Sequence, residues 1–160
     1  MAGTTTKKAV IRRFDREPIA GYLNPLSFVR PEGVELLSAT GNVIRVSGEE
    51  IKMICFVRDL ETTGEVGRLL FQTRPKMEGL WVRFQFRDGE VMEGVLPNNL
   101  LQMETHGFTA IPPDSYSNNQ RIFVPKTAVT SVKVLGVVGS PLKKRKPKAP
   151  PKDQIGLFEE

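Results

Sequence analysis

The chain has 160 residues, 39% of them apolar and 26% charged, and a formal net charge of +5, which is typical of a soluble globular protein with one ordinary or two small domains. It contains no apolar run near the ~20 residues that span a bilayer and no signal-peptide core. Its single cysteine excludes an internal disulfide framework and a multi-cysteine metal cluster. We therefore expect a cytoplasmic protein with no membrane partner.

The first half of the chain predicts five short β-strands. Runs rich in β-branched and aromatic residues, separated by Gly, Pro, Asn, Asp and Ser, cover residues 9–14, 19–23, 34–38, 42–46 and 52–58. The 3.6-residue period of an amphipathic helix is hard to find anywhere in the chain. An all-β fold is therefore expected.

The second half predicts five further strands, over residues 81–86, 91–96, 100–105, 121–124 and 130–138. Asp88-Gly89 supplies a tight hairpin turn between the first two, because glycine tolerates positive φ. Gly94 within the second strand fits the sharp bend of a strongly curved sheet. Asn98 and Asn99 then turn the chain.

The two sets of strands are related by an internal repeat. Asp15 and Gly21 recur at one common offset as Asp88 and Gly94, and a stretch that begins at Ile44 recurs from Ile122 at a slightly longer offset. The second offset is longer by five residues, and these five residues are assigned to a loop of the second half over residues 112–120, which is dense in turn formers. The predicted organisation is a first unit over 7–59, a linker over 60–79, a second unit over 80–138 and a tail over 139–160.

The motifs of each unit resemble those of a known barrel family. Residues 87–101, with Asp88-Gly89 and Gly94, resemble the first motif of the Sm-like, or Hfq-like, family, and residues 124–129 resemble its second motif. Residues 79–96 and 121–136 are also similar to an uncharacterised bacterial domain family. The resemblance implies two tandem five-stranded Sm-like barrels, which either pack together or assemble into a ring-like homo-oligomer.

The same resemblance implies contacts with single-stranded nucleic acid. Sm-like proteins bind RNA bases with an Asp or Asn after the second strand and with a cation between the fourth and fifth strands. Asn98, Asn99 and Lys126 occupy these positions in the second unit. In the first unit, Glu49 and Glu50 stand where the cation is expected and would repel phosphate. The alternative role of Asn98 and Asn99 is simple turn formation.

The tail predicts a disordered, basic segment. Residues 141–152 hold four prolines and six Lys or Arg, which favours extended and solvated backbone. Lys143, Lys144, Arg145 and Lys146 either contact phosphates of RNA or DNA in a salt-dependent manner or only keep the segment extended and soluble.

An apolar peptide ends this tail. The order of Gln154, Ile155, Leu157 and Phe158 resembles the short peptide with which bacterial replication and repair proteins dock on the sliding clamp. In that family the Gln makes polar contacts, and the Leu and Phe fill a hydrophobic cleft; Gly156 stands where Ser or Asp is commoner. The alternatives are a different protein partner, or a segment that folds back on its own domain.

The residue types needed for catalysis are sparse. His106 is the single histidine, and Cys55 lies in an apolar run where a small buried hydrophobe is the commoner role. We expect no enzyme activity, no cofactor and no metal. The expected function is an adaptor or accessory factor that docks on a partner through its terminal peptide and makes auxiliary contacts with nucleic acid. The alternative is an Sm-like regulatory protein that binds single-stranded RNA or DNA.

Overall fold

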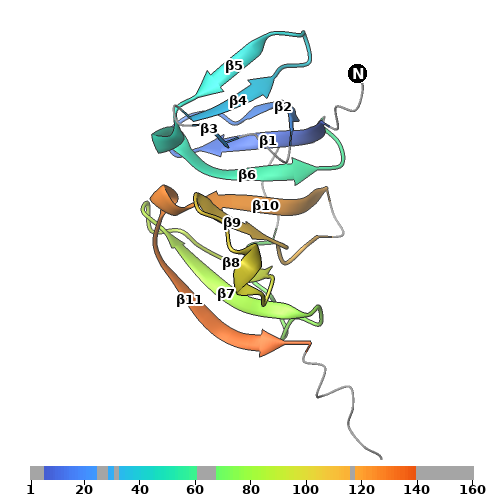
Figure 1. Cartoon of the computed structure of the whole chain (residues 1–160), viewed down its shortest axis with the longest axis vertical. Coiled ribbons are helices and arrows are strands. Elements are labelled where there is room, and N and C mark those ends of the chain that lie inside the picture. Colours follow the sequence, from blue (N-terminus) through green and yellow to red (C-terminus); the bar gives the residue numbers. More distant parts are fainter. Residues whose placement is uncertain (1–5, 25–28, 31–32, 61–67, 116–117, 140–160) are drawn as a thin grey trace, which may run out of the picture.

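The computed structural model describes residues 6–24, 29–30, 33–60, 68–115 and 118–139 (Figure 1). Within these ranges the fold is all-β, as predicted. The strands are β1 (Lys7–Arg13), β2 (Ile19–Leu23), β3 (Val29–Arg30), β4 (Gly33–Leu37), β5 (Val43–Val46), β6 (Ile51–Val57), β7 (Gly79–Phe86), β8 (Val91–Leu96), β9 (Gly107–Ala110), β10 (Asn119–Pro125) and β11 (Val129–Val138). Three short 3₁₀-helices accompany them: η1 (Gly48–Glu50), η2 (Leu100–Gln102) and η3 (Lys126–Ala128).

The strands form two antiparallel sheets rather than two separately closed barrels. The larger sheet has the order β3-β4-β2-β1-β6-β10-β9, with β5 paired to β4, and the smaller sheet has the order β11-β7-β8. Strand β6 is hydrogen-bonded along both edges, to β1 and to β10. Because both edges of β6 are occupied, the first half does not close on itself, and one sheet runs through both halves of the molecule (Figure 1).

The order of strand pairing is nevertheless the same in the two halves. It is β5-β4-β2-β1-β6 in the first half and β10-β9-β8-β7-β11 in the second, where an antiparallel bridge between Val95 and Ile111 connects β8 to the end of β9. The pairing of β1 with β6 skips Lys52, and the pairing of β7 with β11 skips Thr130. Because Thr130 is the repeat equivalent of Lys52, the same irregularity occurs at the same place in both halves.

The register within each half also repeats. Ala9 pairs with Gly21 between β1 and β2, and Val82 pairs with Gly94 between β7 and β8, which are the equivalent positions that the repeat in the sequence indicated. The turn predicted at Asp88-Gly89 is present: Gly89 has a φ of 95° and donates its N–H to the carbonyl of Phe86 at 2.9 Å.

The strand predicted over residues 100–105 is wrong. Leu100–Gln102 forms η2, and the third strand of the second half is Gly107–Ala110. The Asn99 side chain accepts a hydrogen bond from the backbone N–H of Leu101 at 3.0 Å, which holds the chain in a tight turn where an extended strand was expected. Strand β4 begins at Gly33 and its equivalent β9 begins at Gly107, so one of the five residues by which the second half is longer precedes β9, and the other four follow it.

Two apolar cores lie on opposite faces of a shared wall made by β6 and β10. Alternate residues of β6 enter different cores, with Ile54 in one and Cys55 in the other. Strand β10 does the same with Phe123 and Ile122, which pair with Ile54 and Cys55 respectively. Each core is therefore closed by residues from both halves of the chain.

An ion-pair cluster joins the halves at one end of this wall. The Nζ of Lys52, on β6, lies 2.8 Å from a carboxylate oxygen of Asp88 and also bonds to Glu90, both from the turn between β7 and β8. The same Nζ lies 5.1 Å from the ring centroid of Phe86 and 5.8 Å from that of Phe14. A cation from the first half is therefore paired with two carboxylates of the second half and lies near one aromatic ring from each half.

Arg87 makes a second connection beside this cluster. Its guanidinium carbon lies 4.0 Å from the ring centroid of Phe14. It donates hydrogen bonds to the carbonyl of Thr127, at 3.0 Å, and to the carbonyl of Glu49. Since Phe14 and Glu49 belong to the first half, Arg87 holds η1 and η3 next to each other.

Within the described ranges, no helix is long and apolar enough to cross a membrane.

Candidate nucleic-acid interface

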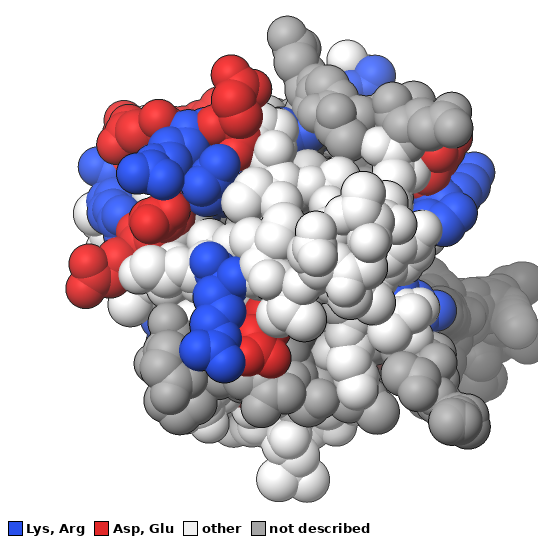
Figure 2. All heavy atoms as spheres, turned by 90° about the horizontal axis from the view of Figure 1, so that it is seen from above, with Lys and Arg blue, Asp and Glu red and all other residues white. Residues whose placement is uncertain are grey.

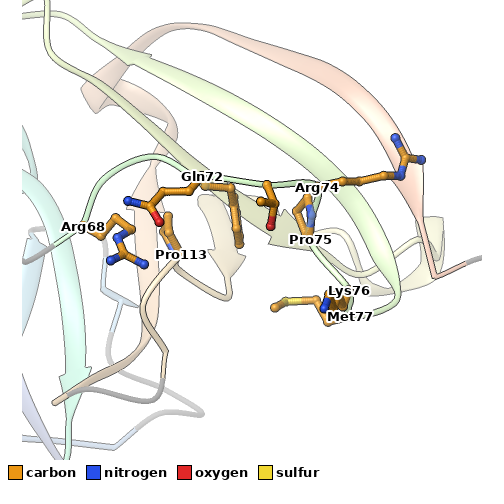
Figure 3. Close-up of a pocket in the computed structure, with 9 residues that line it drawn as sticks. Arg68, Gln72, Arg74, Pro75, Lys76, Met77 and Pro113 are labelled. Atoms are coloured by element: carbon orange, nitrogen blue, oxygen red, sulfur yellow. The ribbon is translucent and has the colours of Figure 1, made fainter.

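A cavity of about 470 Å³, open to solvent, lies along the segment that leads from the first half into β7 (Figure 3). Among the residues that the structure describes, its lining contains three cationic side chains and no carboxylate. The lining residues are Arg68, Phe71, Gln72, Thr73, Arg74, Pro75, Lys76, Met77 and Pro113. A cationic lining is suited to a negatively charged ligand.

Glu93, on β8, anchors this segment to the sheet. Only 2% of Glu93 is exposed. Its backbone N–H donates to the carbonyl of Leu69 at 2.8 Å, and its carboxylate accepts from the backbone N–H of Phe71 at 3.0 Å. The carboxylate also accepts from Trp81 Nε1 at 3.1 Å and from Arg83, whose Nη2 lies 2.6 Å away. One buried side chain thus connects β7, β8 and the cavity wall.

The hydrogen bonds keep Glu93 ionised. Burial opposes the charged form, but the bonds from Arg83, from the backbone of Phe71 and from Trp81 outweigh it and lower the pKa of the Glu93 carboxyl below its ordinary value. A charged acceptor makes stronger hydrogen bonds than a neutral one. The anchor is therefore strongest when Glu93 is ionised.

An aromatic pair supports the same wall. The rings of Phe71 and Trp81 meet edge to face, with centroids 6.4 Å apart and planes 84° apart. Phe71 is half-buried and also lines the cavity. The aromatic part of the lining is consequently held in place before any ligand arrives.

The three cations differ in their availability. Arg74 donates a hydrogen bond from Nη2 to the carbonyl of Val137 on β11, at 2.6 Å. Figure 3 shows its guanidinium directed away from Arg68 and toward β11. Arg68 and Lys76 are exposed and lie toward opposite ends of the segment (Figure 3). These two side chains are the ones suited to contact phosphates of an extended strand, with Gln72 and Thr73 between them as hydrogen-bonding groups.

The residues predicted from the Sm-like resemblance lie elsewhere. Asn99 caps η2 as described above, and Asn98 is exposed in the turn before it. Lys126 begins η3, and its Nζ lies 6.0 Å from the ring centroid of Phe108. In the described part of the chain, no hydrogen bond or ion pair joins Asn98 or Asn99 to Lys126. The turn-forming alternative therefore accounts for Asn99, and a base-contacting role for Asn98 and Lys126 stays a prediction.

Two leucines beside these asparagines were missed by the sequence reasoning. Leu100 and Leu101 are 83% and 95% exposed on η2. Their apolar character favoured a buried strand in the sequence, whereas the cap at Asn99 turns both outward. They form an exposed apolar tip near the end of β8.

The remaining predicted site residues lie outside the described part of the chain. These are the basic residues Lys143, Lys144, Arg145 and Lys146 and the docking residues Gln154, Ile155, Leu157 and Phe158. The cavity, in contrast, lies within the stretch that was expected to be a linker, 60–79. The signal that could have located it is the concentration of Arg68, Arg74 and Lys76 around a phenylalanine.

Comparison with known proteins places the chain in a family without assigning it an activity. No curated protein and no solved structure matches the chain. Residues 5–136 match the model of a family described as a family of unknown function, DUF6982. The matched residues include both halves of the fold and the cavity segment between them. Since the match extends over most of its length, the chain belongs to the DUF6982 family of unknown function.

Proposed function

We propose that this protein is an adaptor that docks on a partner protein through its C-terminal peptide and holds single-stranded nucleic acid beside that partner. The proposed partner is the bacterial sliding clamp, and the proposed docking residues are Gln154, Ile155, Leu157 and Phe158. The nucleic-acid contacts are assigned to the cavity face, supplemented by Lys143, Lys144, Arg145 and Lys146. The protein itself performs no chemistry in this role.

The observation that carries the nucleic-acid part is the charge of the cavity face. Arg68 and Lys76 are exposed cations toward opposite ends of the cavity, and none of the described residues that line it is a carboxylate. In contrast, the carboxylates of Asp88 and Glu93, whose pKa values are lowered, are held in ion pairs with Lys52 and Arg83. These two acids are thus neutralised by cations of the fold, while Arg68 and Lys76 line the cavity.

The architecture supports an Sm-like origin for the two halves. They share one pairing order, one register between their first two strands and one irregularity, at Lys52 and at Thr130. We propose that each half is an Sm-like unit and that β6 and β10 connect the two units. A binding function is in keeping with such units, because loops and exposed faces carry it while the strands stay unchanged.

Fluorescence anisotropy with labelled single-stranded RNA and DNA tests the nucleic-acid part. Arg68→Gln combined with Lys76→Gln should weaken binding and reduce the slope of log K against log salt by about 1.4, because each phosphate contact on a single strand contributes about 0.7. The matched control is Lys7→Gln with Arg16→Gln, which removes the same charge from exposed residues of the first half. Equal effects of both pairs would mean that only net charge matters and that the cavity face is not the site.

The docking part has its own test. Leu157→Ala with Phe158→Ala should abolish binding to purified bacterial sliding clamp in a direct titration, while Glu159→Ala with Glu160→Ala should leave it intact. Thermal unfolding should be the same for all three chains. A loss of stability in the Leu157 and Phe158 variant would instead support the alternative that the peptide packs on its own domain. No binding of the unmodified chain would exclude the clamp as partner.

A further inference from the structure

The lining of the cavity combines two kinds of surface. Arg68 and Lys76 are cations toward its opposite ends (Figure 3). Four of its other described residues are apolar: Phe71, Pro75, Met77 and Pro113. A phosphate group carries only charged, hydrogen-bonding oxygens, which are not satisfied by an apolar surface. The lining therefore fits a ligand in which an anionic group is joined to an apolar one.

Polar side chains of this lining are available to such a ligand. Among the described residues, neither Arg68 nor Lys76 forms an ion pair, and the side chain of Gln72 has no hydrogen-bond partner. At the end of the molecule that holds β5, in contrast, Lys and Arg side chains lie next to carboxylates (Figure 2), and Arg45 Nε lies 2.9 Å from Oε2 of Glu35. The cavity thus offers two cations and an amide that the described part of the fold does not use itself.

Phe71 supplies an aromatic surface whose position is held by two contacts. Its backbone N–H donates to the carboxylate of Glu93 at 3.0 Å, and its ring meets Trp81 edge to face. Trp81 is held in turn by its own hydrogen bond from Nε1 to Glu93, at 3.1 Å. Phe71 nevertheless stays half-buried, so part of it remains open where it lines the cavity. A ring that is fixed and partly exposed is suited to stack with a planar aromatic group.

One end of the cavity carries hydrogen-bonding groups of both kinds. Figure 3 shows the side chain of Gln72 directed toward Arg68, next to Pro113. The amide of Gln72 contains a donor and an acceptor, whereas the guanidinium of Arg68 contains donors only. The edge of a nucleobase likewise presents donors and acceptors side by side, while a phosphate presents acceptors only. Gln72 is therefore suited to the edge of a base, and Arg68 is suited to a phosphate.

We propose that the cavity binds one nucleotide, with its base stacked on Phe71 and the edge of that base at Gln72. In a strand, a nucleotide has a phosphate on each side, and these two phosphates then lie at Arg68 and Lys76. A nucleotide is the ligand class that fits, because its base is planar and aromatic and its phosphate is anionic. The inference rests on the proposed function and adds a base-binding role to the cavity face. A free nucleotide is a second source of the same chemistry.

The size of the cavity suits a single nucleotide rather than a duplex. Its volume of about 470 Å³ lies within the range of pockets that enclose small molecules. A base reaches a protein ring only after it has left its own pairing and stacking, so the site selects single strands. The described lining residues do not include the positions that the Sm-like resemblance assigns to base contacts. The base site is therefore separate from those positions.

Fluorescence anisotropy with two labelled strands of equal length tests the proposal on the full chain. One strand is ordinary single-stranded DNA, and the other has the same sugar-phosphate backbone without bases. Because the phosphates are the same, the electrostatic part of binding is matched, and the difference in affinity measures the contribution of the base. The unmodified chain should bind the strand with bases about tenfold more tightly, as expected for one base stacked on an aromatic ring.

Variants of Phe71 locate the base. Phe71→Leu keeps an apolar side chain but removes the ring, so it should lose the preference for bases while its affinity for the strand without bases stays the same. Phe71→Tyr keeps the ring and should retain the preference. The matched control is Leu70→Ala, because Leu70 is 44% exposed in the same segment and is not among the described lining residues. Thermal unfolding checks that each variant is folded.

Gln72→Met tests the contact with the base edge at an exposed position that is not part of the Glu93 anchor. The unmodified chain should have different affinities for strands that each contain a single type of base. These affinities should become closer to one another in Gln72→Met, because the thioether cannot replace the donor and acceptor of the amide. Equal affinities in the unmodified chain, or differences that persist in Gln72→Met, would overturn the role of Gln72.

Competition against the labelled strand distinguishes the two sources of the nucleotide. Adenosine 5′-monophosphate and ribose 5-phosphate carry the same phosphate, and only the first has a base. Stronger displacement by adenosine 5′-monophosphate supports the proposal and shows that free nucleotides share the site. Displacement that is equal for both, together with a preference for the strand with bases, supports the proposal with the strand as the source.

The outcomes that contradict the proposal differ from those that contradict the proposed function. Equal affinity for the strands with and without bases would overturn the base site but leave phosphate contacts at the cavity face intact. A base preference that survives Phe71→Leu would overturn it as well, because the base must then bind elsewhere. Binding of neither strand by the unmodified chain would overturn both the base site and the nucleic-acid part of the proposed function.

Discussion

Gly33 and Gly107 occupy the same position in the two halves of the chain, each against the backbone of the strand paired with it. A Cβ on Gly33 would lie 2.2 Å from the carbonyl oxygen of Val46, and a Cβ on Gly107 would lie 2.4 Å from that of Val124. Val46 and Val124 are themselves equivalent positions of the repeat. Strands β4 and β5 in the first half, and β9 and β10 in the second, therefore approach each other closely at the same position, where each half has a glycine.

Alanine at either glycine should destabilise the protein by about 1–3 kcal/mol, because the backbone of the paired strand must move. Gly33→Ala should cost more than Gly107→Ala, since Gly33 also has a φ of 136°, where L-residues are strained. Urea unfolding measures both. Gly48→Ala is the control: nothing lies within 4 Å of its Cβ position, and it should change stability by less than about 0.5 kcal/mol.

Glu93→Gln should reduce the free energy of unfolding by about 2 kcal/mol, because hydrogen bonds to a charged acceptor are lost and N–H donors are left unpaired. The same change should weaken nucleic-acid binding, since Phe71 and its neighbours lose their attachment to β8. Glu17→Gln, at an exposed position, should do neither. Unaltered nucleic-acid binding in Glu93→Gln would show that the cavity wall does not depend on this anchor.

The stabilisation by Glu93 should depend on pH in a defined direction. Its pKa is lower in the folded protein than its ordinary value of 4.5. The contribution is therefore complete above that ordinary value and is lost as the pH falls through the lowered one. The difference in unfolding free energy between the unmodified chain and Glu93→Gln should thus shrink at acid pH. A difference that stays constant would contradict this assignment.

Lys52→Met should destabilise the protein by about 1–2 kcal/mol, a modest figure because Asp88 and Glu90 are each more than one-third exposed and solvent screens them. Burial disfavours the charged amine, but Asp88 and Glu90 outweigh it and raise the pKa of Lys52 above its ordinary value of 10.5. The contribution is complete below that value and is lost as the pH rises through the raised one. Unfolding of both chains at pH 7 and in strong base measures this, with Lys7→Met as the exposed control.

Cys55 should be unreactive in the folded protein. Burial raises the pKa of its thiol to about 11, although the neighbouring Arg12 opposes the shift. Little thiolate exists at neutral pH, and the side chain is not accessible. A chromogenic disulfide reagent should therefore label Cys55 only at the rate at which the chain unfolds, and at once in denaturant. Rapid labelling without denaturant would show that the β6–β10 wall opens readily.

Asn99→Ala should cost about 1 kcal/mol by removing the cap of η2, and Asn99→Ser should restore most of it, because the hydroxyl can accept the same N–H. Nucleic-acid affinity should be equal for both variants and for the unmodified chain. Affinity lost in both variants would instead indicate that the Asn99 amide contacts bases, as the Sm-like resemblance implies.

The sequence determined most of the strands, with the third strand of the second half as an exception, because strand formation depends on the local order of residue types. Apolar-rich runs bounded by turn-forming residues place β2 at Ile19–Leu23 and β8 at Val91–Leu96, as predicted. Asp88-Gly89 specifies a turn through its local backbone preference alone. The internal repeat was visible for the same reason: equivalent side chains are needed wherever the same pairing is built twice.

Long-range contacts decided the remainder. Which strand occupies the second edge of β6 depends on the three-dimensional approach of β10, which lies in the other half of the chain, and this pairing replaced two closed barrels by a continuous sheet. Leu100 and Leu101 were apolar enough for a strand, but one side-chain hydrogen bond from Asn99 turned them to solvent. The cavity face lies in a stretch that was expected to be a linker. Its position is fixed by Glu93, which is 22 residues beyond Phe71 and holds the stretch to the sheet. Pairing between residues that are distant in the chain leaves no local pattern in the sequence. For that reason, only the tertiary structure revealed the continuous sheet and the cavity.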